Sequence, residues 1–127
     1  MSPERMDVLL RQAVLDFTPV KGGFDPDLVA RSIADLGVHF RDPVDPRIYV
    51  VTSDAALAQE FEARRKADPE AALPPTLRIS VSPERIFVGP SAFEEEAPLT
   101  RTFITWLTST YECRISNDEG VDLAPAE

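Results

Sequence analysis

Residues 77–89 constrain the fold more than any other stretch of this sequence. Leu77, Ile79 and Val81 alternate with polar residues, which is the period of a strand with one buried face. After three turn-forming residues comes a continuously apolar run, residues 86–89, as in a strand that is covered on both faces. The stretch therefore predicts an antiparallel hairpin. An isolated hairpin is marginally stable in water, so the rest of the chain must supply further strands and a cover.

Length and composition are those of one globular domain spanning residues 1–127. Of the 127 residues, 43% are hydrophobic and 28% are charged, within the usual range for globular proteins. No run approaches the ~20 apolar residues of a membrane-spanning helix, and the N-terminal residues lack the pattern of a signal peptide. Cys113 is the only cysteine, which excludes an internal disulfide and predicts a reducing, cytoplasmic location.

The formal net charge of the chain is −9. This acidity argues against nucleic acid, whose backbone requires a basic surface, and against anionic membranes. It favours a partner protein with a basic surface, and it also keeps a protein soluble. Arginine outnumbers lysine and alanine is abundant, as is typical of proteins encoded by GC-rich bacterial genomes.

Three segments have the sequence signals of helices. Residues 24–37 begin with Asp25 as N-cap and Pro26 in the first turn, and they end at a glycine. Residues 54–67 follow Ser53, which we expect to cap them, and contain two Glu-to-basic pairs at i,i+4 spacing. Residues 98–111 carry an apolar stripe that predicts a helix packed on a core.

The remaining segments predict strands or extended chain. Residues 47–52 are rich in β-branched and aromatic residues, and residues 112–116 precede a turn after which the chain can pair back. Residues 38–45 are a short edge strand or an extended loop, because Asp-Pro pairs interrupt them. Residues 7–17 fit either a strand or a helix, and we favour the strand.

Together these elements predict an α+β fold. From residue 47 to residue 116 their order is β-α-β-β-α-β, which resembles the ferredoxin-like pattern, with helices on one face of an antiparallel sheet. We expect a single-domain two-layer α/β sandwich with this core and an additional N-terminal β-α or α-α unit. The residues expected to be buried together in its core are Phe61, Ile79, Phe87, Phe103 and Leu107.

The sequence contains few residues of the kinds that carry catalysis or bind cofactors. One histidine, His39, and one cysteine, Cys113, are too few for a structural zinc site. Lys21 precedes two glycines, which is the reverse of a phosphate-binding loop. A negative and a positive residue flank Cys113, so nothing clearly activates its thiol. We therefore predict no catalytic residue, no metal and no cofactor.

We expect a small, acidic, cytoplasmic bacterial protein-interaction domain without catalytic activity. One concrete version is an immunity or inhibitor protein for a basic partner, an association that rests on size and charge. The alternative is an α/β small-molecule-binding regulatory domain, or an enzyme with an unfamiliar site. A pocket that contains two or more of His39, Tyr49, Cys113 and a carboxylate would favour that alternative.

Two acidic segments are the predicted partner-binding site. Residues 90–98 precede the last expected helix and residues 117–122 follow the last expected strand, so the chain returns the second segment to the end where the first lies. A single negative patch there would speed encounter with a basic partner in a salt-dependent manner. Its six carboxylates are those of Glu94, Glu95, Glu96, Asp118, Glu119 and Asp122.

Overall fold

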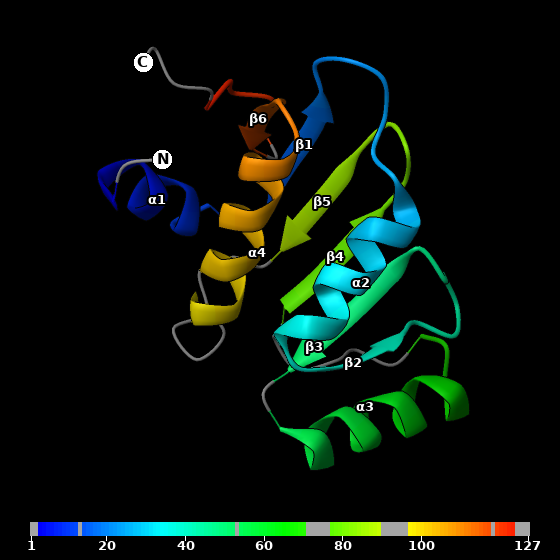
Figure 1. Ribbon diagram of the computed structural model, residues 1–127. Coiled ribbons are helices and arrows are strands. Elements are labelled where there is room, and N and C mark those ends of the chain that lie inside the picture. The colour runs from blue at the N-terminus through cyan, green and yellow to red at the C-terminus, as the bar shows by residue number, and fades with distance from the viewer. Residues whose placement is uncertain are drawn as a thin grey trace.

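The computed structural model describes residues 3–12, 14–52, 54–70, 77–89, 97–117 and 119–123. The helices are interspersed among strands that build one sheet (Figure 1). In chain order the elements are α1 (Pro3–Leu10), β1 (Leu15–Pro19), α2 (Pro26–Leu36), β2 (Val38–Arg41), β3 (Ile48–Thr52), α3 (Ala55–Ala67), β4 (Leu77–Val81), β5 (Ile86–Gly89), α4 (Ala97–Thr110) and β6 (Cys113–Asn117).

The strands are ordered β2-β3-β4-β5-β1-β6 across the sheet, and every neighbouring pair is antiparallel. The hairpin expected in residues 77–89 is present as β4 and β5, with Val81 opposite Ile86. β1, which comes first in the sequence, lies between β5 and β6 (Figure 1). After β6 the chain pairs back, as expected, through a bridge between Ser116 and Asp122. The α+β class and the antiparallel sheet are thus confirmed.

The ferredoxin-like core expected over residues 47–116 is not confirmed. In that pattern each β-α-β unit is split, because another strand lies between the two strands that the helix joins. β5, α4 and β6 meet this condition, with β1 between the two strands. β3 and β4, which flank α3 in the sequence, are instead direct neighbours. Both edges of β5 are paired, with β4 and with β1, so β3 takes the remaining edge of β4.

One face of the sheet, which we call the covered face, packs against α2 and α4, and α1 packs beside α4 (Figure 1). Alternate residues of β1, β3, β4, β5 and β6 point to this face and form one continuous core with the helices. Directly opposed residues make rows across it, such as Tyr49, Ile79, Val88 and Leu15. Phe103 of α4 is fully buried in this core.

α3 lies on the opposite face, next to β2 and β3 (Figure 1). Phe40 and Val50 form a second buried cluster with Ala58 and Phe61 of α3. Because Val50 is flanked by residues that point to the covered face, its side chain and α3 must lie on the other side of the sheet. The expected two-layer sandwich with all helices on one face is therefore wrong at this end of the sheet.

The predicted core divides in the same way. Ile79, Phe103 and Leu107 are buried together under the covered face. Phe61 is buried in the second cluster, on the other side of the sheet. Phe87 is 36% exposed, because it points to the face opposite α4 and is not part of the cluster under α3. A continuously apolar run in β5 therefore does not mean that both of its faces are covered.

The ambiguous segment, residues 7–17, contains parts of two elements. α1 continues to Leu10 and buries Met6 and Leu9, whereas β1 begins at Leu15 and buries Leu15 and Phe17. The favoured strand is therefore wrong for the first half of the segment, and the N-terminal unit is α-β-α. The sequence fits both periods because the first half of the segment is helical and the second half contains a strand.

N-cap residues fix where α2 and α3 begin. Asp25 accepts hydrogen bonds from the amides of Asp27 and Leu28, at 3.0 and 3.4 Å, as expected for the start of α2. α3 is capped by Asp54, whose carboxylate accepts from the amide of Ala56 at 2.8 Å. The expected cap, Ser53, lies outside the described residues and is one position too early. The carboxylate of the next residue reaches the first-turn amides instead.

Candidate functional site

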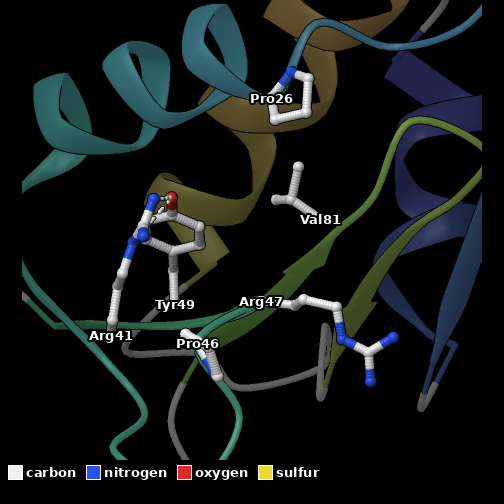
Figure 2. Close-up of a pocket in the computed structure, with 6 residues that line it drawn as sticks. All are labelled: Pro26, Arg41, Pro46, Arg47, Tyr49 and Val81. Carbon is white, nitrogen blue, oxygen red and sulfur yellow. Dashed lines mark hydrogen bonds between the residues drawn. The ribbon is translucent and has the colours of Figure 1, made fainter.

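A hollow of about 260 Å³ lies beside the start of α2, near the ends of β2 and β4 (Figure 2). Arg41 and Tyr49, which contribute to its wall, are directly opposed on β2 and β3. Both side chains belong to the covered face, beside the first turn of α2. The residues that line the hollow are Pro26, Arg41, Pro46, Arg47, Tyr49 and Val81.

Arg41 and Tyr49 form one polar unit in this hollow. The Arg41 Nε donates a hydrogen bond to the Tyr49 hydroxyl at 3.1 Å, and Nη2 donates to the same oxygen. The centre of the guanidinium lies 5.0 Å from the centroid of the Tyr49 ring, within the range of a cation–π contact. Tyr49 is only 5% exposed, so its ring is fixed by the core and holds the guanidinium in place.

The second arginine of the hollow has a different environment. Arg47 donates from Nε and Nη2 to the carboxylate of Asp45, both at 3.0 Å. Its side chain points away from Arg41 and Tyr49 (Figure 2). Hydrogen bonds from Arg47 hold the pKa of Asp45 below its usual value, so this pair stays ionised at neutral pH. Arg47 thus contributes its stem to the wall, while its charge is neutralised outside.

Arg41 has no carboxylate partner among the described residues, unlike five of the other arginines. Ion pairs join Arg47 to Asp45, Arg64 to Glu60, Arg65 to Asp42, Arg85 to Asp16 and Arg101 to Asp7. The hollow therefore presents one guanidinium that makes no ion pair in the described structure. Such a group is suited to an anionic ligand.

A second candidate site is the part of the other face that α3 does not reach, over β4, β5, β1 and β6. In the described chain this surface, which we call the open face, has no helix packed on it (Figure 1). Direct pairing places Ser80, Phe87 and Asp16 in one row across it, and the neighbouring rows carry the arginines. Its defining residues are Asp16, Arg78, Ser80, Arg85, Phe87 and Arg114.

Arg85 and Phe87 make the centre of the open face. The Arg85 guanidinium donates to the carboxylate of Asp16 and lies 4.8 Å from the centroid of the Phe87 ring. The hydrogen bond from Arg85 to Asp16 raises the pKa of Arg85 above its usual value. Asp16 is buried beneath this contact, whereas the Arg85 side chain is half-exposed. The result is a planar cation stacked on an aromatic ring at the surface.

The open face is positively charged in a chain whose net charge is −9. Arg78 and Arg114 have no carboxylate partner in the described part of the chain. The Nε of Arg78 is buried and makes no hydrogen bond there. Asp16 is the one carboxylate among the six residues that define this surface, and it accompanies three arginines.

The acidic patch expected from the sequence is largely outside the described structure. Glu94, Glu95, Glu96 and Asp118 are not among the described residues. Glu119 and Asp122 are exposed in the segment that follows β6. The six carboxylates as a group therefore remain a prediction.

His39 and Cys113 lie at opposite edges of the sheet, on β2 and on β6. At about 4.8 Å between neighbouring strands, they are on the order of 20 Å apart. Burial raises the pKa of the Cys113 thiol to about 11, so the thiol is neutral at pH 7. His39 lies near Tyr49, with ring centroids 6.1 Å apart, but does not line the hollow. Of the residues named for the small-molecule alternative, only Tyr49 lines the hollow, so the expected combination of two or more is not present there.

Comparison with protein-family models, with curated proteins and with solved structures finds no match to this chain. Among the described residues, no group of three His, Cys, Asp or Glu side chains is placed to hold a metal ion. No helix in the same residues is long and apolar enough to cross a membrane. The chemistry of the hollow and of the open face is therefore the basis for assigning a function.

Sequence reasoning missed both candidate sites for the same reason. The hollow depends on the pairing of Arg41 with Tyr49, and the open face depends on the pairing of Phe87 with Asp16. Neither pairing follows from a local pattern. The alternation of Arg78 and Ser80 with apolar residues did indicate a polar face, and it is the one signal that pointed toward the open face.

Proposed function

We propose that this chain is a small, non-catalytic interaction domain of the cytoplasm, and that its open face binds an acidic segment of a partner protein. The observation that carries the proposal is the combination of an exposed aromatic residue, Phe87, with three arginines on a sheet surface that no described helix covers. An antiparallel sheet can face water on one side, but such a face needs only polar side chains. Aromatic residues and arginine together are enriched at protein interfaces.

Charge complementarity favours an acidic partner for this surface. Arg78 and Arg114 have no carboxylate partner in the described chain, and Arg85 presents a half-exposed guanidinium. Carboxylates of a bound segment would supply the missing counter-charges through bidentate hydrogen bonds. The basic partner expected from composition would instead use the acidic segments, most of whose residues lie outside the described structure. The open face therefore supports the acidic partner better.

A protein segment is favoured over single-stranded nucleic acid. Arginine and aromatic side chains on a sheet also form stacking platforms for bases. Nucleic-acid binding, however, requires a positive potential that extends along the phosphate backbone, and this chain has a net charge of −9. A short acidic peptide needs only the local positive surface.

The test is a selection of random peptides displayed on phage against the immobilised protein. We expect the enriched peptides to be rich in Asp and Glu, and we expect Arg114→Glu to weaken their binding by about tenfold or more. Arg31→Glu is the matched control, because Arg31 is exposed on α2 and the charge change is the same. It should change the affinity by less than about twofold.

Two results would overturn the proposal. Enrichment of basic peptides that bind Arg114→Glu as well as the unchanged protein would place the partner surface elsewhere. Binding of a uridine 12-mer that competes with the selected peptides and is lost in Arg114→Glu would make the open face a nucleic-acid platform. Circular dichroism of each variant shows that the fold is intact.

A further inference from the structure

We propose that the hollow beside α2 binds a single carboxylate group attached to a small apolar body, with Arg41 and Tyr49 as its hydrogen-bond donors. The proposal is independent of the open face, because the two surfaces lie on opposite sides of the sheet and share no residue. It rests on the donor chemistry, the size and the charge of the hollow.

The donor chemistry follows from the contact between Arg41 and Tyr49. The Tyr49 hydroxyl accepts hydrogen bonds from Nε and Nη2 of Arg41, so its remaining role toward a ligand is to donate its own proton. The guanidinium has five N–H groups, and three of them remain after those two bonds. Every polar group that this unit can still offer is a donor. The complementary ligand group is therefore an acceptor, and the charge of Arg41 makes it an anion.

The hollow restricts the ligand to a small body with apolar surface. Its volume of about 260 Å³ is slightly below the ~300–1,000 Å³ typical of pockets for larger ligands. Pro26, Pro46 and Val81 supply apolar walls, and the two prolines have fixed backbones. A branched aliphatic or aromatic acid fits these walls better than a polar metabolite does.

The charge of the hollow favours one negative charge over two. Of the two arginines that line the hollow, only Arg41 is without a carboxylate partner in the described structure, since Arg47 is paired with Asp45. Two carboxylates also adjoin the lining residues in the chain, because Asp25 precedes Pro26 and Asp45 precedes Pro46. Asp25 already accepts from the first-turn amides of α2, which are the donors that a phosphate would use. A carboxylate monoanion therefore fits better than a phosphate dianion.

Arg41 is also positioned before any ligand arrives. Its guanidinium is held by the ring and the hydroxyl of Tyr49, which is almost fully buried. Ordering a flexible side chain normally opposes binding, and here much of that ordering is already present in the fold. A small acid can therefore bind measurably with few contacts.

The experiment is a titration of the ¹⁵N-labelled protein with isobutyrate and benzoate, followed by amide and arginine Nε–H chemical shifts. We expect saturable shifts that centre on β2 and β3, with dissociation constants on the order of 1 mM. Arg41→Gln should abolish them. Tyr49→Phe keeps the ring and removes the hydroxyl donor, so we expect about fivefold to tenfold weaker binding. Arg31→Gln is the matched control, because Arg31 is exposed on α2 and does not line the hollow, and it should leave the affinity unchanged within about twofold.

Neutral and dianionic probes decide whether the carboxylate is recognised. Isobutyramide and benzamide should produce no saturable shift, and inorganic phosphate should bind at least about tenfold more weakly than benzoate. Equal binding of the amides, equal binding of phosphate, or full binding to Arg41→Gln would each overturn the proposal. An acetylated Ala-Ala-Val peptide with a free or an amidated C-terminus identifies the source. Stronger binding of the free-acid peptide than of isobutyrate assigns the site to a chain end, and the reverse assigns it to a free organic acid.

Discussion

The two faces of this sheet are built from the same strands and have opposite properties. On the covered face, the row of Tyr49, Ile79, Val88 and Leu15 is buried beneath the helices. At the adjacent positions of β4, β5 and β1, the open face carries the polar residues Ser80 and Asp16 and the exposed ring of Phe87. The two faces differ because the crossover helices pack on one of them. That face stabilises the fold, and the other is left available for binding.

The handedness of crossover connections explains why α2 and α4 share a face. The antiparallel order makes β1 parallel to β2, and β5 parallel to β6, so α2 and α4 each connect parallel strands of one sheet. The two connections run in opposite directions across the sheet, and they start from strands that point in opposite directions. Right-handed crossovers then place both helices on the same side. α3 joins adjacent antiparallel strands, to which the rule does not apply, and it packs on the other face.

The largest expected effect contrasts two phenylalanines. Phe103→Ala should lower the free energy of unfolding by about 3–5 kcal/mol, because Phe103 is fully buried under the covered face. Phe87→Ala should lower it by less than about 1 kcal/mol, because Phe87 is already 36% exposed. Urea unfolding followed by circular dichroism measures both. Equal losses in the two variants would show that the open face is covered in solution.

A second test concerns the thiol of Cys113, which belongs to the covered face at its β6 edge. Burial raises its pKa to about 11 from the usual 9.0, so at pH 8 we expect about a hundredfold less thiolate than for an exposed cysteine. The rate of reaction with a chromogenic disulfide reagent should be lower by about that factor and should recover in urea. A rate in the native protein equal to that in urea would mean that the edge of the covered face is open.

The third test concerns the ion pair that ties α3 to the end of β2. Arg65 and Asp42 are joined at 3.0 Å, and their side chains are only 16% and 8% exposed. Arg65→Met should therefore lower the free energy of unfolding by about 1–3 kcal/mol, because it leaves a buried carboxylate without its partner. Arg64→Met is the matched control, since its pair with Glu60 is exposed and should be worth less than about 0.5 kcal/mol. Similar losses in both variants would contradict a buried pair.

The same pair predicts a pH dependence. Burial alone would raise the pKa of Asp42, but hydrogen bonds from Arg65 and from the Val44 amide outweigh burial and hold the pKa below its ordinary 3.8. The pair therefore stabilises the protein fully above that ordinary value and is lost as the pH falls through the lower, folded-state pKa. Urea unfolding below pH 4 should show a steeper loss of stability in the unchanged protein than in Asp42→Asn. Parallel curves would show that Asp42 is not ionised in the fold.

The smallest expected effect is a gain. Arg78 points to the open face beside the cluster under α3, and its Nε is buried without a hydrogen-bond partner in the described structure. Arg78→Met removes that donor and keeps an apolar stem, so we expect the free energy of unfolding to rise by about 0.5–1 kcal/mol. The same variant should also weaken the binding of the selected acidic peptides to the open face. A loss of stability would mean that the Arg78 guanidinium makes a stabilising contact.

Sequence reasoning succeeded where the signal is local and failed where it depends on pairing. The hairpin of β4 and β5, the start of α2 at Asp25 and the return of the chain after β6 all follow from short-range patterns. The exposure of Phe87 does not, because it depends on which face the crossover helices take. The same holds for the hollow, since Arg41 and Tyr49 meet only through the β2–β3 register.

The position of β1 has a consequence for how the chain is made. Phe17 pairs with Ile86 on one side and with Ile115 on the other, so both partners of β1 belong to the last third of the sequence. During synthesis β1 leaves the ribosome before β5 and β6, with both edges unpaired and with Leu15 and Phe17 unburied. Contacts between such distant segments slow folding, and an unpaired apolar strand is prone to pair with other chains. β1 therefore gains its first paired edge only when β5 has emerged, and its second only with β6.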